Sequence, residues 1–344
     1  MQKLDGVEGD ERAEARRLVL SLVIPVYRNE ESIPDVLAVL NQLHAQLQGD
    51  LEAVFVVDAS PDRSVEKISA GLSAAPYRGQ LLILSRNFGS FGAIVAGFQS
   101  GRGDLFAVMA ADLQEPPELV LEFRRLLASG QADVVVGTRQ GRGDPWMSRV
   151  GSRIFWSLYR RLVQLEIPPG GVDVFGCTKA FRDHLVSLSE RNSTLVGLLL
   201  WLGFRRVDVP YVRRSRRHGR SAWSFGRKFR YLLDSTFAFS DLPLRLLWVS
   251  GILGVTLSIV LGSIVTVARL VGDLDVPGYA ATVLVVMFFG GLNSFGIGLL
   301  GEYLWRTFEN TKGRPLFVVA SQVVYPGANL EPESGRTVLT GFGS

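Results

Sequence analysis

The sequence predicts an α/β domain over residues 18–222, followed by a transmembrane helical hairpin over 244–302. In the first region, short apolar runs typical of buried strands alternate with amphipathic helical patterns, which predicts a parallel sheet with helices on both faces. Two stretches without a charged residue, 246–268 and 279–301, are each long enough to cross a bilayer as a helix. The remaining segments flank these two units: a solvated tail at 1–17, an interfacial amphipathic helix at 223–243 and a cytoplasmic segment at 303–344.

Apolar runs bounded by turn residues mark the expected strands, in chain order 18–26, 51–57, 81–84, 105–110, 132–137 and a strand-like stretch at 205–212. Helical spacing marks the helices between them, at 33–47 behind a Ser32 N-cap, 64–72, 91–101 and 117–129. Open parallel sheets bind ligands at the carboxyl ends of their strands. The polar groups that follow the strands are therefore candidate site residues, at 27–31, 58–62, 85–87 and 112–115.

Two further helical patterns, 149–165 and 223–239, carry basic residues beside an apolar stripe. Basic amphipathic helices next to a membrane span suit the bilayer interface, but ordinary packing on the α/β domain explains the same pattern. We favour the interface for 223–239 and leave both readings open for 149–165.

The two uncharged stretches are expected to span a membrane rather than to form core helices of a soluble protein, because two such stretches in tandem are rare in soluble cores. Basic residues flank the pair on its outer sides, so the positive-inside rule places both termini in the cytoplasm. Glycines in 290–301 give the second stretch a small-residue face suited to close helix packing, including a homo-oligomer, although glycine is common in membrane helices generally.

Charge and cysteine content exclude several classes of protein. The net charge is only +4, but arginines concentrate in 204–245, which suggests phosphate groups or an anionic membrane as partners. No nucleic-acid-binding signature accompanies them, so nucleic acid is not an expected partner. The single cysteine, Cys177, excludes an internal disulfide framework and a Cys-based zinc cluster, and the three isolated histidines argue against a His-rich metal site. Residues 1–17 lack the apolar core of a signal peptide.

The turn after 105–111 places three oxygen ligands, Asp112, Gln114 and Glu115, within four residues. Hard oxygen ligands at a strand end suit Mg²⁺ or Mn²⁺ bound to a diphosphate. An isolated aspartate on a loop is more often a helix cap than a metal ligand, so this motif alone leaves both readings open.

Several strings together resemble family-two glycosyltransferases of the polyprenyl-phosphate branch, which includes dolichyl-phosphate and undecaprenyl-phosphate sugar transferases. The similar strings span roughly 18–320 and are Ser21–Ser32, Val56–Asp62, Leu84–Gly89, Ala111–Glu118, Arg216–Trp223, Phe239–Arg245 and Gly301–Tyr303 with Lys312, Arg314 and Pro315. The resemblance implies a glycosyltransferase A-type, Rossmann-like nucleotide-sugar domain. It also implies an enzyme that moves a sugar from a nucleotide sugar to a polyprenyl monophosphate.

The resemblance assigns roles residue by residue. The nucleotide sugar would be bound by Pro25, Tyr27, Glu30, Asp58, Arg86 and Ser221, and the metal by Asp112 and Gln114. Arg139, Arg149 and Ser152 would lie near the acceptor phosphate, and Asp173 near the sugar. Arg216 and Arg220 would lie over the diphosphate and act with Asp112 and Asp173 in catalysis, whereas Arg213 and Arg214 are expected to be surface contacts.

Departures from the family pattern keep alternatives open. Val57 and Ala110 stand where the family usually has acids, Ala59 where it has glycine and Ala222 where it often has lysine. A non-catalytic nucleotide-sugar-binding scaffold would explain these changes. A polysaccharide synthase would share the fold but normally carries a Gln-x-x-Arg-Trp string and more spans.

The expected reaction is an inverting transfer at the cytoplasmic face of the cell (inner) membrane, with UDP-glucose slightly favoured over GDP-mannose and other UDP sugars. A polyprenyl phosphate is largely ionised near neutral pH, since second phosphate pKa values lie at about 6. It therefore needs no strong base, and arginines with a metal suit the leaving diphosphate better than a His–Asp relay does.

Overall fold

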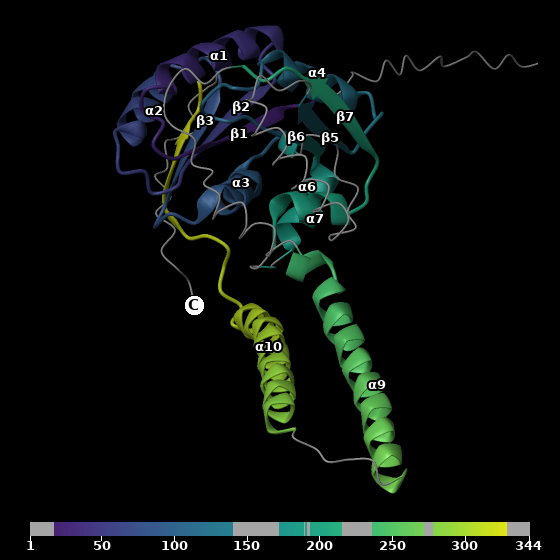
Figure 1. The fold of residues 1–344 in the computed structure, drawn as a ribbon. Coiled ribbons are helices and arrows are strands. Elements are labelled where there is room, and N and C mark those ends of the chain that lie inside the picture. The colour runs from purple at the N-terminus through teal and green to yellow at the C-terminus, as the bar shows by residue number, and fades with distance from the viewer. Residues whose placement is uncertain are drawn as a thin grey trace, which may run out of the picture.

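The computed structural model describes residues 17–139, 172–188, 190, 193–214, 236–271 and 278–328. In these residues a twisted eight-stranded sheet is covered by helices on both faces, and two long helices extend away from it (Figure 1). The expected helix at 149–165 and most of that at 223–239 lie outside the described residues, as does the tail at 1–16.

The alternating first part of the domain is confirmed element by element. The strands are β1 (Leu20–Val26), β2 (Leu51–Val57), β3 (Arg78–Leu84), β4 (Leu105–Val108) and β5 (Val134–Arg139). The helices between them are α1 (Ile33–Gln46), α2 (Ser64–Ser73), α3 (Gly89–Ser100) and α4 (Glu118–Ala128). β1 pairs in parallel with both β2 and β4, and β2 with β3, as an alternating chain requires.

The expectation of a parallel sheet holds for the six predicted strands, β1 to β5 and the stretch at 205–212, which all run in the same direction, but the whole sheet is mixed. The strand order is β7-β5-β6-β4-β1-β2-β3-β8, and both β6 (Val172–Thr178) and β8 (Val319–Tyr325) run antiparallel to their neighbours. β7 (Arg206–Tyr211) confirms the strand-like stretch and pairs in parallel with β5. An apolar run indicates a strand but not its direction, which depends on the tertiary path of the chain.

The two faces of the sheet carry separate apolar layers. One layer packs α1, α2 and α4 against the strands, and the other packs α3, α6 (Lys179–Ser187) and α7 (Leu195–Trp201). Thr178 and Thr194 begin the last two helices as N-caps, each accepting a hydrogen bond from a backbone N–H in the first turn. These caps explain where α6 and α7 start, although the sequence analysis assigned no helix there.

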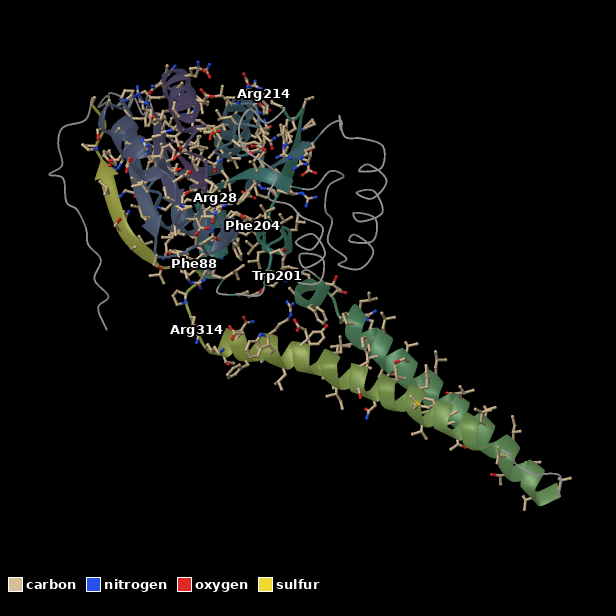
Figure 2. All side chains as sticks on the ribbon, turned by 60° about the vertical axis from the view of Figure 1, so that its left-hand side comes forward. Arg28, Phe88, Trp201, Phe204, Arg214 and Arg314 are labelled. Atoms are coloured by element: carbon tan, nitrogen blue, oxygen red, sulfur yellow. The ribbon has the colours of Figure 1, made fainter. Side chains whose placement is uncertain are left out.

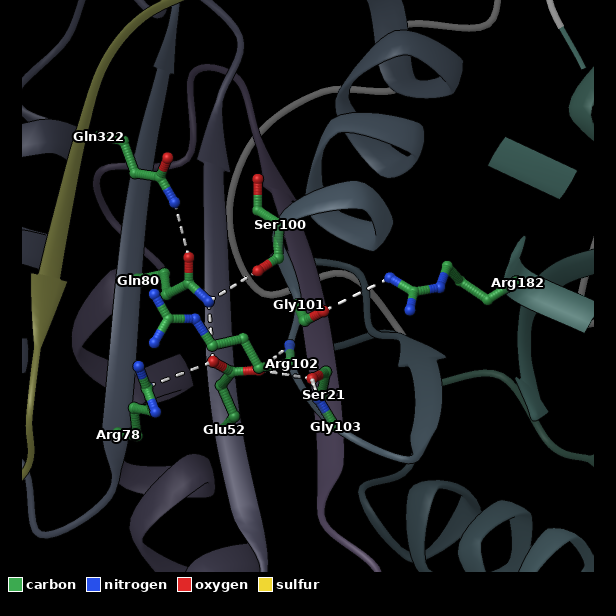
Figure 3. Close-up of polar contacts among 10 residues, drawn as sticks. All are labelled: Ser21, Glu52, Arg78, Gln80, Ser100, Gly101, Arg102, Gly103, Arg182 and Gln322. Carbon is green, nitrogen blue, oxygen red and sulfur yellow. Dashed lines mark hydrogen bonds and ion pairs between the residues drawn. The ribbon is translucent and has the colours of Figure 1, made fainter. Parts of the chain in front are cut away.

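A buried polar network ties the sheet together at the amino ends of its strands (Figure 3). Glu52 of β2 is 1% exposed and accepts hydrogen bonds from Ser21 Oγ, from Gln80 Nε2 at 2.7 Å and from the backbone N–H of Arg102 at 2.8 Å. Gln322 of β8 donates to Gln80 Oε1 at 2.8 Å. The network therefore joins four strands and fixes β8 to the sheet by side chains as well as by its backbone ladder.

Replacing Glu52 with alanine is expected to lower the free energy of unfolding by about 3 kcal/mol, because buried donors lose their acceptor. The matched control is Glu122→Ala, which breaks an exposed pair with Arg125 and is expected to change it by less than about 0.5 kcal/mol. Denaturant unfolding in detergent measures both variants. Equal unfolding midpoints would show that the network contributes nothing specific.

The two long helices are α9 (Leu242–Val271) and α10 (Tyr279–Thr311). They contain apolar spans at Leu242–Val267 and Val285–Thr311. In the most apolar part of each span, 0% and 6% of the residues, respectively, are buried in the protein. Core helices of soluble proteins bury such surfaces, so the pair fits the expected hairpin. The loop at 272–277 lies outside the described residues.

Side-chain contacts link the two ends of the hairpin that lie next to the sheet. The ring of Phe237 packs edge-on against Tyr303 at 5.2 Å, and the guanidinium of Arg306 lies 5.0 Å from the centre of the Phe237 ring. The segment before α9 and the last turns of α10 therefore lie at the same level (Figure 1).

Candidate active site

The sheet opens at its carboxyl edge between β1 and β4. The chain runs from β1 through β2 to β3 on one side, and then returns to place β4 on the other side of β1. The β1–β4 ladder ends at Val23–Val108, whereas the β1–β2 ladder continues to Val26–Val57. Pro25 pairs with Val56 of β2 but lies beyond the end of the β1–β4 ladder, so its missing N–H breaks no bond to β4. Such a reversal in strand order is where ligands bind in open α/β sheets.

The loop after β1 forms one wall of this opening. Tyr27 is 41% exposed, and the Arg28 guanidinium lies 5.4 Å from the centre of its ring. Arg28 has a φ of 56°, a left-handed conformation that is uncommon outside glycine. Its backbone N–H donates to Ser60 Oγ at 2.7 Å, so the loop after β2 holds this backbone conformation.

Glu30 fastens the same two loops together. Its carboxylate accepts the backbone N–H of Arg63 at 2.8 Å, and its own N–H donates to Asp62 at 3.1 Å. Burial tends to raise the pKa of Asp62, but hydrogen bonds from Ser60, Ser64 and the Glu30 backbone outweigh it and lower that pKa. Asp62 is therefore an ionised anchor for the loop, a role that the sequence analysis did not assign.

Asp58, at the end of β2, is turned into the protein and is 4% exposed. Its two carboxylate oxygens accept the backbone N–H groups of Phe88 and Gly89, at 2.7 and 2.8 Å, where α3 begins. Burial raises its pKa, opposed by these two hydrogen bonds and by the charge of Arg86. Asp58 thus caps α3 and positions the loop after β3, in which the Arg86 guanidinium lies 4.2 Å from the centre of the Phe88 ring.

The loop after β4 forms the opposite wall. Asp112 is half-buried, and Leu113 adopts a left-handed φ of 51°, so that the backbone N–H of Gln114 reaches Asp112 Oδ1 at 3.4 Å. Gln114 is 8% exposed. Its side-chain oxygen accepts a hydrogen bond from Arg213 Nη2, and its backbone carbonyl accepts the N–H of Arg214 at 2.8 Å.

The residues of this wall suit a metal only if a ligand completes the coordination. Among the described residues no three His, Cys, Asp or Glu side chains are grouped to hold a metal ion. Asp112 offers a carboxylate, but the amide oxygen of Gln114 already contacts Arg213. Mg²⁺ is commonly held by one or two carboxylates with substrate phosphates and water, and this set fits that kind of site.

Two other expected site positions reach the same edge. Arg139 ends β5 and is in register with Tyr211 of β7, two residues before Arg213. Because β6 is antiparallel, its first residues lie beside the last residues of β5, with Val172 opposite Thr138. The reversed strand therefore brings the backbone of Asp173 to the carboxyl edge.

The expected surface role of Arg213 is wrong, because the guanidinium is partly buried against Gln114. Figure 2 places Arg214 on the side of the domain away from the long helices, with its side chain paired to Glu118 at 3.3 Å. No local pattern links residues 114 and 213, although the excess of basic residues in 204–245 was a signal for an anion site. Arg149, Ser152, Arg216, Arg220 and Ser221 lie outside the described residues.

Comparison with known proteins agrees with this geometry. The model of "Glycosyl transferase family 2" matches residues 21–187. An uncharacterized glycosyltransferase of Synechocystis is 32% identical over 304 residues, covering 88% of this chain and 94% of the relative. A bactoprenol glucosyl transferase of Shigella phage SfX is 30% identical, covering 88% and 99%. An undecaprenyl-phosphate 4-deoxy-4-formamido-L-arabinose transferase of Klebsiella pneumoniae is 31% identical, covering 89% and 94%.

These relatives align along both the α/β domain and the two apolar helices, so the resemblance inferred from the motifs is confirmed. The mixed sheet with its opening between β1 and β4 is accordingly a glycosyltransferase A-type domain. This chain belongs to glycosyltransferase family 2.

Proposed function

We propose that this glycosyltransferase transfers a sugar, with glucose from UDP-glucose favoured, from a nucleotide sugar to a polyprenyl monophosphate at the cytoplasmic face of the cell membrane. The observation on which the proposal rests is that one chain contains both a sheet with polar residues at the opening between β1 and β4 and two apolar helices exposed along their length. Relatives of the same extent are named for bactoprenol and undecaprenyl phosphate.

The donor would lie between the two walls of the opening. Exposed Tyr27 and the backbone beside Pro25 would face the nucleoside, with Glu30, Asp58 and Arg86 holding the surrounding loops. Asp112, with Gln114, would hold Mg²⁺ or Mn²⁺ against the diphosphate, and the bound ion would supply Lewis-acid stabilisation of the leaving group. Ser221 remains part of the proposed donor site.

The acceptor phosphate oxygen would attack the anomeric carbon as the bond to the nucleoside diphosphate breaks, inverting the configuration. The acceptor phosphate and the donor diphosphate are both anions, so cations at the carboxyl edge are needed to offset their repulsion and to stabilise the leaving group. Arg139 is at this edge, and the buried Nε of Arg213 has no hydrogen-bond partner among the described residues. Arg149, Ser152, Arg216 and Arg220 remain proposed phosphate contacts, and Asp173 a group that orients the sugar.

Arg213→Ala is expected to lower turnover by about 10²-fold, because removing a donor aimed at developing charge costs about that much. Arg214→Ala removes a side chain that is 53% exposed and paired to exposed Glu118, so a change of less than about threefold is expected. Initial rates in detergent with a short-chain polyprenyl phosphate compare the two. Equal, small losses would mean that Arg213 only supports the loop.

A catalytically inactive scaffold is the second candidate, because Val57 and Ala110 replace family acids. Incubation of the purified protein with radiolabelled nucleotide sugars and polyprenyl phosphate separates the two candidates. Formation of labelled lipid with one donor of a panel supports the enzyme and names its sugar. Binding of donors without any labelled lipid would overturn the proposal.

The fold supports the proposed two crossings. β8 follows α10 in the chain and pairs with β3, which precedes α9, and this pairing supports a topology in which both ends of the hairpin lie on one side of the membrane. Leu274→Cys is expected to react with a membrane-impermeant thiol reagent in intact cells. Protection at this position, with labelling only after permeabilisation, would overturn the proposed sidedness.

A further inference from the structure

The C-terminal end of α7 presents a large aromatic side chain to solvent. Trp201 is 60% exposed, whereas Leu198 and Leu199 of the same helix are buried in the apolar layer of the domain. Three residues after Trp201, the ring of Phe204 packs edge-on against Phe181 of α6 at 5.2 Å, which attaches the segment after α7 to the domain. An exposed tryptophan on a rigid helix is a feature of a contact surface.

α7 is fastened to the segment that leads into the hairpin. At Gly197 an added Cβ would meet ring atoms of Phe239 at 2.1 and 2.4 Å, so only glycine leaves room for this ring against the helix. Trp201 follows Gly197 by four residues and therefore lies on the same face of α7. Phe239 is three residues before α9 begins, and Figure 2 shows Trp201 on the side of the domain that faces the start of α9.

The long helices carry exposed tryptophans at the same end. Trp248 of α9 is 69% exposed and Trp305 of α10 is 55% exposed. Each lies six residues inside the domain-proximal end of its helix, or about 9 Å at 1.5 Å per residue. Tryptophans at matching depth on two apolar helices are typical of the boundary between acyl chains and headgroups.

We propose that α7 is a third membrane contact of the enzyme, in which Trp201 inserts into the lipid headgroup boundary beside the two spans. Lipid is favoured over a second protein copy because the face is continuous with the hairpin through Phe239 and lies at the end that carries Trp248 and Trp305. Arg245 and Arg306 at this end are each paired with a carboxylate, Asp241 at 2.9 Å and Glu302 at 2.8 Å, so the proposed contact depends on the tryptophans rather than on charge. The contact would hold the domain against the bilayer through α7, on the part of the domain far from strand β8.

A nitroxide attached at Trp201→Cys tests the contact without any need for turnover. The native Cys177 is fully buried and burial raises its thiol pKa, so the unsubstituted protein serves as the labelling blank. The protein is reconstituted into vesicles containing anionic phospholipid. Collision of the label with oxygen, which concentrates in lipid, is compared with collision with a water-soluble nickel chelate.

Two further label positions calibrate the measurement. Val255, replaced by cysteine, lies in the middle of the first apolar span and is 61% exposed. Val212, also replaced by cysteine, is 70% exposed and lies two residues before Arg214, which Figure 2 shows on the side away from the long helices. The oxygen-to-nickel ratio at residue 201 is expected to lie between these two and several-fold above that at 212. A ratio at 201 equal to that at 212 overturns the inference.

The controls separate this inference from the proposed function. If the label at 255 is not in lipid, the membrane assignment itself fails; if 255 is in lipid and 201 is in water, only the α7 contact fails. Dipolar broadening at 201 that disappears on dilution with unlabelled protein would indicate a contact between two copies instead, and would also overturn the lipid contact.

Discussion

Asp112→Ala is expected to reduce turnover by roughly 10³-fold, because a metal held at the diphosphate contributes several kcal/mol to transition-state stabilisation. The loss should be large here because Ala110 stands where the family usually has a second acid, and the side-chain oxygen of Gln114 already contacts Arg213. Initial rates across a Mg²⁺ titration measure both the residual rate and the metal concentration required.

The matched control is Glu122→Ala, which removes an exposed carboxylate from the following helix α4 and should leave the rate within about twofold, as expected for a surface pair. Unfolding curves of the two variants should coincide, since Asp112 is half-buried on a loop. Turnover that is unchanged by Asp112→Ala, or that persists in excess chelator, would show that the diphosphate is stabilised by arginines alone.

Truncation after residue 318 is expected to abolish the folded domain, although every element proposed to contact substrate remains. β8 contributes six register pairs along β3, and losing its hydrogen bonds at about 1 kcal/mol each would cost roughly 5 kcal/mol. That is comparable to the whole stability of many domains, about 5–15 kcal/mol. Thermal unfolding in detergent and the amount of monodisperse protein measure the effect.

Truncation after residue 328 is the control, because it keeps β8, the Ser69–Tyr325 hydroxyl contact and the hydrogen bond from the Ala328 N–H to Ala75. This variant should unfold within a few degrees of the full chain. If truncation after 318 left the unfolding temperature equally unchanged, β8 would be a passive extension of the sheet.

The sequence predicted the part of the fold that depends on local patterns. Strands β1 to β5 are apolar runs, and polar residues follow β1 to β4 within a few positions, so the sequence could predict both the strands and the edge of the sheet where ligands would bind. The direction of β6 and the return of β8 to β3 were not, because they depend on contacts across long separations in the chain.

The candidate site divides in the same way. Tyr27 comes directly after β1 and Asp112 four residues after β4, so the sequence could predict that both lie at the carboxyl edge of the sheet. The hydrogen-bond partners of the site residues were not predictable: Arg213 reaches Gln114 across 99 residues, and Asp58 caps α3 from 30 residues away. A motif identifies a residue that can donate, accept or bind a metal, but the tertiary fold decides which neighbour it meets.

The position of β8 at the end of the chain also determines when the sheet can be completed during synthesis. A ribosome finishes β3 long before it reaches residues 319–325, and both apolar helices are made in between. At about 5–20 residues per second this interval lasts on the order of tens of seconds, during which β3 has an unpaired strand edge. In the proposed topology the sheet can close only after the second helix has brought the chain back to the starting side, so a molecule in which a single helix crosses the membrane cannot pair β8 with β3.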